Sequence, residues 1–149
     1  MKMKLFCLLW LAYGVFLPCA YAQPQTAAGL WKSIDDHTGK AKALIRISEH
    51  DGVFEGKIET ILPTPGQEPN PVCSKCEGSL HDQPVLGMQI LNGFRFDGEM
   101  YNGGTILDPD NGKVYKSRMK LGEDGSTLDV RGYIGIPLLG RSQTWLREQ

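Results

Sequence analysis

AKALIRIS, residues 41–48, decides the fold class, because apolar and polar side chains alternate along it. Its odd positions are all apolar, and Lys42, Arg46 and Ser48 occupy even positions. A period of two places successive side chains on opposite faces of a β-strand. The stretch is therefore predicted to form a strand with one buried face and one face in water.

The rest of the chain repeats this pattern between turn signals. Further strands are predicted over 29–35, 53–62, 94–100, 103–108, 113–121, 127–134 and 140–147. Asp-Gly and Asn-Gly pairs at 51–52, 111–112 and 124–125 mark three of the connections as hairpin turns. About eight short antiparallel strands must close or cover their edges, so an all-β barrel or sandwich is expected.

One region interrupts the pattern. Residues 62–84 contain five prolines and both cysteines of the central region, Cys73 and Cys76. Proline lacks the backbone donor that a central strand needs, so a long loop is predicted there. The following stretch, residues 87–93, is compatible with a helical turn or a short strand.

The N-terminus has the order of parts of a secretory signal peptide. Lys2 and Lys4 form a positive n-region, residues 5–17 are an apolar run, and residues 20–22 are an Ala-x-Ala cleavage signal. The run is shorter than the roughly 20 residues that span a bilayer, which favours cleavage over a retained membrane anchor. We expect cleavage before Gln23.

The chain is thus divided into a signal peptide, 1–22, and a single β-barrel domain, 23–149, of a periplasmic or secreted protein. Lipidation at Cys19 is disfavoured because Pro18 stands where a small residue is expected. No other stretch is long and apolar enough to span a membrane, so no integral membrane segment is expected after cleavage.

Composition limits the function classes. The 149 residues carry 16 Lys+Arg and 17 Asp+Glu, for a formal net charge of -1. This balance excludes a generic nucleic-acid binder that relies on a basic surface. Protein partners are not indicated by the composition.

The Cys73-x-x-Cys76 motif is the sharpest local feature. A redox motif of this kind opens a helix after a strand, whereas here the pair lies in a proline-rich loop. A structural disulfide is therefore favoured for an exported protein. Redox exchange stays open, as does a zinc site with His81, although a tetrahedral site needs a fourth ligand that the sequence does not show.

No catalytic constellation is found in the sequence. There is no Gly-x-Ser-x-Gly elbow and no His-Glu-x-x-His spacing. The paired carboxylates, Asp35 with Asp36 and Asp108 with Asp110, lie in or beside turns, where Asp caps the backbone. No enzyme activity, cofactor or metal is expected.

An apolar, glycine-rich segment, residues 132–140, includes the end of the strand predicted over 127–134 and continues beyond it. An exposed segment of this kind at a barrel mouth would mark a contact with a partner or ligand. The favoured interpretation is a buried connection that packs under the end of the barrel.

Several short motifs, taken in order, resemble one family. They are Gly29-Leu30-Trp31, Asp36 with Thr38-Gly39, Gly56-Lys57-Ile58, Cys73-Ser74-Lys75-Cys76-Glu77-Gly78, residues 103–109, residues 111–115, residues 130–135, and residues 139–145 with Arg147. This order resembles the domain-of-unknown-function 2147 family of exported bacterial proteins, over residues 28–147. The resemblance implies a small periplasmic or secreted β-barrel similar to lipocalins and no established enzyme activity.

A second resemblance concerns the two ends of the barrel sequence. Lipocalin-like barrels often carry Gly-x-Trp on the first strand and an Arg near the last strand, stacked over that Trp. Trp31 and Arg147, or Arg141, stand in the matching order. We therefore expect Trp31 to be buried near one barrel end beneath an Arg, in a cation–π contact.

The expected function is the binding of a small apolar ligand inside the barrel, since eight strands enclose room for side chains or one small ligand. Four small residues that are predicted to face inward would leave that room: Ala43, Gly56, Ser117 and Gly132. The expected ligand-binding residues are Phe54, Ile58, Tyr115, Met119 and Val130.

Two alternatives remain from the sequence. The first is a structural or interaction protein of the cell envelope with a filled core. The second is an envelope redox or metal-handling protein that uses Cys73 and Cys76. An interior void separates the ligand barrel from the filled barrel, and a thiol titration separates both from the redox protein.

Overall fold

A computed structural model describes residues 25–35, 38–62 and 64–148. The expected signal peptide and the cleavage site before Gln23 lie outside these residues. Within the described part of the chain, no helix is long and apolar enough to cross a membrane.

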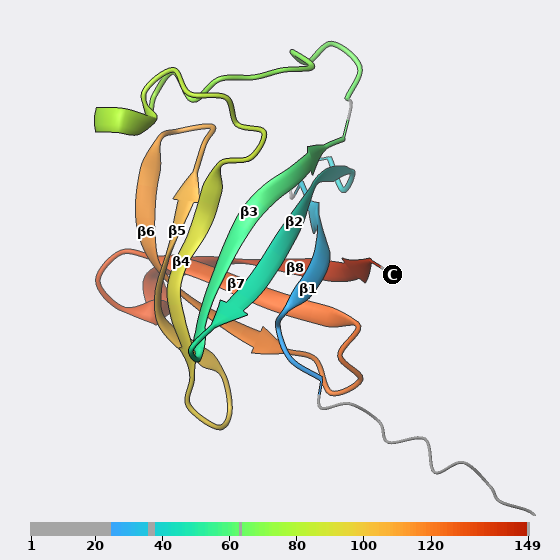
Figure 1. Ribbon diagram of the computed structural model, residues 1–149, viewed down its shortest axis with the longest axis vertical. Helices are drawn as coiled ribbons and strands as arrows, with labels where there is room; N and C mark the ends of the chain where they lie inside the picture. The colour runs from blue at the N-terminus through green and yellow to red at the C-terminus, as the bar shows by residue number, and fades with distance from the viewer. Residues whose placement is uncertain (1–24, 36–37, 63, 149) are drawn as a thin grey trace, which may run out of the picture.

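Eight strands follow one another around a closed barrel (Figure 1). They are β1 Gly29–Ile34, β2 Ala41–His50, β3 Val53–Ile61, β4 Gln89–Phe96, β5 Tyr101–Asp108, β6 Lys113–Leu121, β7 Thr127–Tyr133 and β8 Gly140–Glu148. Among the described residues, two 3-10 helices lie in the connections: η1 Gly78–Leu80 and η2 Pro137–Leu139. Each strand pairs antiparallel with the next, and β8 pairs with β1, which leaves no open edge. The predicted all-β barrel of about eight strands is confirmed.

The fourth strand differs from its prediction. The sequence predicts a strand over 94–100 and leaves 87–93 undecided, whereas β4 covers most of the undecided stretch and stops short of residue 97. The carboxylate of Asp97 accepts hydrogen bonds from the backbone N–H groups of Met100 and Glu99, each at 2.9 Å. These bonds build a tight turn after β4 and hold the pKa of Asp97 below its usual value.

One half of the barrel interior is filled with large side chains. Trp31, Leu91 and Phe94 are fully buried there. Two glycines admit them: a Cβ at Gly56 would lie 2.8 Å from Cδ1 of Leu91, and a Cβ at Gly104 would overlap the Phe94 ring. This half of the barrel can pack closely because positions 56 and 104 are glycines, which leave room for the side chains of Leu91 and Phe94.

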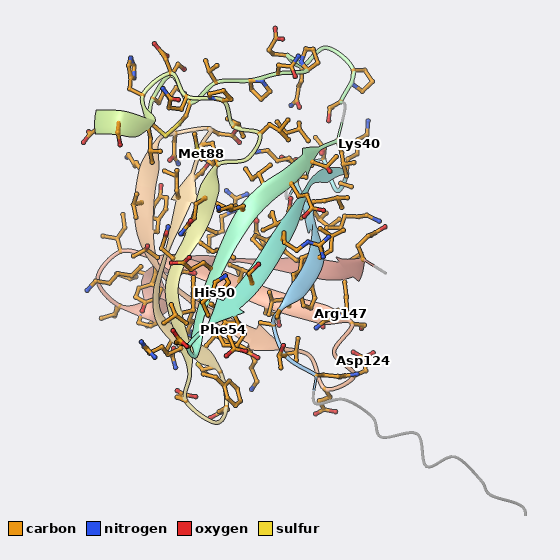
Figure 2. All side chains as sticks on the ribbon, viewed as in Figure 1. Lys40, His50, Phe54, Met88, Asp124 and Arg147 are labelled. Carbon is orange, nitrogen blue, oxygen red and sulfur yellow. A yellow bond between two sulfur atoms is a disulfide. The ribbon has the colours of Figure 1, made fainter. Side chains whose placement is uncertain are left out.

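Arg147 closes the packed end. Its Cζ lies 4.2 Å from the centroid of the Trp31 ring, and its guanidinium donates hydrogen bonds to the carbonyl oxygens of Thr26 and Gly125, each at 2.6 Å. Nε1 of Trp31 donates to the carbonyl oxygen of Ala27 at 2.8 Å. The segment before β1 is thereby held across this end, with Trp31 and Arg147 arranged as the sequence leads us to expect. Figure 2 shows Arg147 at the side of the barrel away from the proline-rich loop.

The proline-rich connection from β3 to β4 extends over the opposite end of the barrel (Figure 1). Cys73 and Cys76 are bonded within it, so the predicted disulfide is confirmed. The disulfide packs against the turn between β5 and β6, where Sγ of Cys73 lies 3.4 Å from the carbonyl oxygen of Pro109. The carbonyl group of Lys75 approaches Gly112 of that turn so closely that a Cβ at position 112 would overlap it. The turn and the disulfide loop therefore support each other.

Replacing both cysteines by serine is expected to lower the free energy of unfolding by about 1 kcal/mol or less. The two cysteines are only three positions apart in sequence, so the bond removes little conformational entropy from the unfolded chain. Urea unfolding of the double variant measures the change. A loss of the folded state, or tight stoichiometric zinc in the unaltered protein, would contradict this prediction.

Candidate ligand-binding cavity

The half of the barrel next to the proline-rich loop contains a cavity of about 1030 Å³ that is open to solvent at this end of the barrel. Buried apolar side chains from six strands line it: Ala43 and Ile45 of β2, Ile58 of β3, Ile90 of β4, Leu107 of β5, Val130 of β7 and Trp145 of β8. In β2, β3, β7 and β8 these positions face inward because side chains alternate along the strand. The registers of β4 and β5 are irregular, and β4 buries the adjacent Ile90 and Leu91 together. The interior is thus divided into a packed half and a hollow half.

Small residues have different effects in the two halves. Ala43 and Gly132 line the cavity and leave space in it. The space beside Gly56 is taken by Leu91, and Ser117 is buried with its hydroxyl donating to the carbonyl oxygen of Arg131 at 3.0 Å. Small inward residues therefore leave room only where no large neighbour fills it.

The five residues expected to bind a ligand are distributed over both halves. Ile58, Tyr115 and Val130 line the cavity. Phe54 and Met119 are buried but do not line it, and the ring of Phe54 meets that of Tyr101 with 4.8 Å between centroids. Figure 2 shows Phe54 well away from the proline-rich loop.

Many cavity residues were not singled out from the sequence, among them the buried Ile45, Ile90 and Trp145. Ile45 lies on the inward face of the alternating 41–48 stretch, so the same signal could have found it. Ile90 falls in the stretch that was undecided between turn and strand, and Trp145 lies in a strand to which no facing was assigned. Only the closed barrel brings these side chains together.

Polar groups deep in the cavity are bonded within the protein. Nε1 of Trp145 donates to Oε1 of Gln143 at 3.1 Å, and the hydroxyl of Ser33 donates to the carbonyl oxygen of Ala43 at 3.3 Å. Among the described residues, every buried side-chain nitrogen or oxygen has a hydrogen-bond partner. The deep wall therefore presents apolar surface without unsatisfied polar atoms.

The cavity mouth is polar. Lys42 of β2 forms an ion pair with Asp110 of the β5–β6 turn, and both side chains line the cavity. Nearby, Nδ2 of Asn111 donates to Oδ2 of Asp108 at 2.9 Å and to the hydroxyl of Tyr115 at 3.0 Å. An apolar interior thus opens through a charged and hydrogen-bonded rim.

The apolar segment after β7 is exposed, so the favoured prediction of a buried connection is wrong. Ile134, Ile136, Leu138 and Leu139 all have largely exposed side chains. Ile134 and Leu139 also line the cavity, which places the segment at its mouth. The segment bends outward after β7, where Gly135 has a positive φ of 74°.

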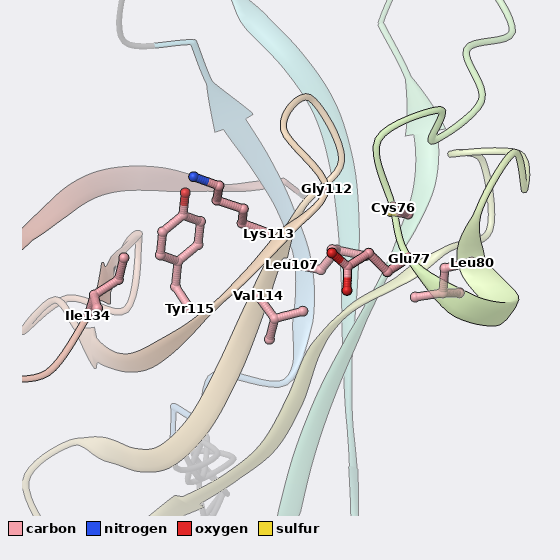
Figure 3. Close-up of a pocket in the computed structure, with 9 residues that line it drawn as sticks. All are labelled: Cys76, Glu77, Leu80, Leu107, Gly112, Lys113, Val114, Tyr115 and Ile134. Atoms are coloured by element: carbon pink, nitrogen blue, oxygen red, sulfur yellow. The ribbon is translucent and has the colours of Figure 1, made fainter.

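A smaller hollow of about 330 Å³ lies between the disulfide loop and β6 (Figure 3). Leu80, Val114 and Ile134 contribute apolar side chains to it, and Glu77 and Lys113 contribute charges. It adjoins the exposed segment after β7 through Ile134. This hollow lies beside the mouth of the larger cavity.

The carboxylates with shifted pKa values lie outside the cavity lining. A hydrogen bond from Arg46 lowers the pKa of Glu59, and a hydrogen bond from the Ser126 hydroxyl lowers that of Asp124. A carboxyl group whose pKa is lower in the folded protein than in the unfolded chain stabilises the fold at pH values above its unfolded pKa. This stabilisation is lost as the pH falls through the folded pKa. These groups therefore act on acid stability and not on the cavity.

Metal ligands are not clustered in the described residues, where no three His, Cys, Asp or Glu side chains are placed to hold an ion. Both sulfurs of Cys73 and Cys76 are used in the disulfide, and Nδ1 of His81 is bonded to the carbonyl oxygen of Cys76 at 3.0 Å. In this oxidised form the pair has no thiolate to offer a metal.

A closed antiparallel barrel of eight strands with an apolar cavity under one end defines a lipocalin-like protein. The chain belongs to the family described as uncharacterized protein conserved in bacteria (DUF2147), whose model matches residues 29–147. The resemblance drawn from the sequence motifs is thereby confirmed.

One solved structure supports the same architecture. The chain is similar to protein HP1028 from the human pathogen Helicobacter pylori, described as belonging to the lipocalin family. The TM-score is 0.70 at 19% sequence identity, and the match covers 82% of each chain. At this identity the likeness shows the fold alone. No match was found among curated proteins.

Proposed function

We propose that this protein binds a small apolar molecule inside its barrel. The observation that carries the proposal is a preformed cavity of about 1030 Å³ whose buried wall is apolar and whose buried polar atoms are bonded within the protein. Burial of an apolar ligand against such a wall is favourable, because apolar surface of both is removed from water. A polar ligand would lose hydrogen bonds to water there and find no buried partner to replace them. Cavities of this size and lining are typical of small-molecule sites.

The cavity supports this proposal over the alternative of a structural barrel with a filled core. The disulfide supports the idea that the protein acts in an oxidising compartment, in the periplasm or outside the cell. A redox role for Cys73 and Cys76 has weaker support, because both are buried against the β5–β6 turn.

Trp145 provides a direct test, because it lines the cavity whereas Trp31 lies in the packed half. We expect native mass spectrometry of protein purified from its host to reveal a retained apolar molecule. After that molecule is extracted, palmitate is expected to change the tryptophan emission.

The matched variants are Trp145→Phe, which should lose the emission change, and Trp31→Phe, which should keep it. A protein that carries no molecule from its host and binds neither palmitate nor a hydrophobic dye would contradict the proposal.

The ion pair between Lys42 and Asp110 is expected to slow exchange through the mouth. Replacing Lys42 by methionine should raise the dissociation rate of a hydrophobic dye by up to about fivefold, since exposed pairs contribute about 0.2–1 kcal/mol. The unfolding free energy should stay almost constant. Stopped-flow fluorescence measures the rate, with Lys57→Met on the outer face of β3 as the matched control. Equal acceleration in both variants would argue against the pair as a barrier.

A further inference from the structure

An apolar loop projects between β7 and β8 at the cavity mouth, at the left of Figure 1. In this mouth loop, residues 134–139, four large side chains are exposed: Ile134 by 69%, Ile136 by 55%, Leu138 by 81% and Leu139 by 74%. Exposed aliphatic side chains that gather within six residues are unusual on a protein surface and mark a candidate interaction site.

The mouth loop is held in this conformation by Arg131. Nε and Nη2 of Arg131 donate to the carbonyl oxygens of Pro137 and Leu138 at 2.6 and 3.2 Å, and Nη1 donates to the hydroxyl of Ser142 at 2.7 Å. The backbone N–H of Leu139 donates to the carbonyl oxygen of Ile136 within η2. The backbone is therefore satisfied while the apolar side chains face outward.

Cationic side chains adjoin the mouth loop. Lys113 lines the smaller hollow together with Ile134 (Figure 3). Lys116 is opposite Tyr133 in the β6–β7 pairing, and Arg118 is directly opposite Arg131. None of these four cations is within ion-pair distance of a carboxylate among the described residues.

Two arginines directly opposite each other on one sheet face destabilise the pairing. The two opposed arginines lie next to the apolar loop. This local positive charge contrasts with the net charge of -1 of the whole chain. The four cations outnumber the carboxylates that the described residues place beside them, which are Glu77 in the hollow of Lys113 and Asp129 two positions before Arg131. A net positive charge next to exposed aliphatic side chains is complementary to an anionic lipid surface.

We propose that the mouth loop and the neighbouring cations dock onto an anionic lipid bilayer. The aliphatic side chains enter the boundary between headgroups and acyl chains, and Lys113, Lys116 and Arg118 contact the anionic headgroups. A protruding loop suits a bilayer better than a folded partner, which would present a rigid surface of its own. Docking is independent of whether the cavity holds a ligand.

Docking would also place the cavity mouth at the lipid surface. Ile134 and Leu139 belong to both the mouth loop and the cavity lining. An apolar molecule that moved between bilayer and cavity would pass these two aliphatic side chains at the otherwise polar rim, and this consequence alone rests on the proposed function.

The test is co-sedimentation of the protein, purified from its host after export, with phosphatidylcholine vesicles that contain or lack phosphatidylglycerol. An intact mass must first show that the protein carries no covalent lipid. We expect binding only with phosphatidylglycerol, and we expect it to weaken as salt is raised. Ile136→Ser with Leu138→Ser, and separately Lys116→Gln with Arg118→Gln, should each weaken binding by about tenfold or more.

Two controls match these variants. Leu86→Ser removes an exposed aliphatic side chain from the proline-rich connection, and Lys57→Gln removes an exposed cation from β3. Both should bind vesicles as the unaltered protein does. Circular dichroism and dye binding report whether each variant keeps its barrel and its cavity, which separates failure of docking from failure of ligand binding.

Three results would overturn the proposal. The first is no binding to vesicles that contain phosphatidylglycerol. The second is equal binding to both kinds of vesicle, or binding that the loop and cation substitutions leave unchanged. The third is a concentration-dependent dimer that the loop substitutions abolish while vesicle binding is absent, which would identify a second copy of the chain as the occupant.

Discussion

The Trp31→Ala variant is expected to unfold with about 3–5 kcal/mol less free energy than the unaltered protein. Trp31 is fully buried, so its removal leaves a large void in the packed half of the barrel. It also removes the ring beneath Arg147 and the hydrogen bond to the carbonyl oxygen of Ala27. Urea unfolding followed by far-ultraviolet circular dichroism measures the loss.

Trp31→Phe is the control for this variant. It keeps an aromatic ring beneath Arg147 and loses only the indole nitrogen and part of the volume, so it should cost clearly less than Trp31→Ala. Because the cavity lies in the other half, dye affinity should be unchanged in Trp31→Phe. A cost below about 1 kcal/mol for Trp31→Ala, or an emission maximum for Trp31 that is typical of water, would contradict this placement.

The second large effect is expected from filling the cavity. Ala43→Phe places a ring where a ligand would lie and displaces roughly four methylene groups of it, at about 0.8 kcal/mol each. Palmitate should therefore bind roughly a hundredfold more weakly, which corresponds to about 3 kcal/mol. The variant should be at least as stable as the unaltered protein, because the ring enters empty space. Isothermal titration and urea unfolding measure the two quantities.

Leu44→Phe is the matched control, because it adds bulk to the next position of the same strand on the opposite face. Leu44 is half-buried, and it does not line the cavity. Its substitution should leave palmitate affinity unchanged. If both variants bind palmitate as well as the unaltered protein does, the ligand does not occupy this cavity.

The sequence by itself determined the fold class of this protein. Alternation in residues 41–48 and in the segments like it specified strands with one buried face, and glycine turns specified several of their connections. Closely spaced cysteines in a proline-rich loop, together with the expected signal peptide, favoured the disulfide over a redox or metal site. These features are local, so they can be recognised without knowledge of the surrounding fold.

Other features needed the tertiary structure. The end of β4 depends on the turn that the carboxylate of Asp97 organises. The pattern of apolar and polar residues over 87–100 did not predict where this strand begins and ends. The exposure of the mouth loop depends on Arg131, which holds carbonyl oxygens several residues away. The ion pair between Lys42 and Asp110 joins positions 68 residues apart.

The division of the barrel into a packed half and a hollow half is likewise a tertiary property. Alternation predicted that Phe54 and Ile58 face inward, and both are buried, yet only Ile58 lines the cavity. Alternation with a period of two predicts which face of a strand a side chain occupies. The depth of that side chain along the barrel axis depends instead on strand tilt and register. Large neighbours such as Leu91 and Phe94 then decide where space remains, and they come from strands distant in sequence.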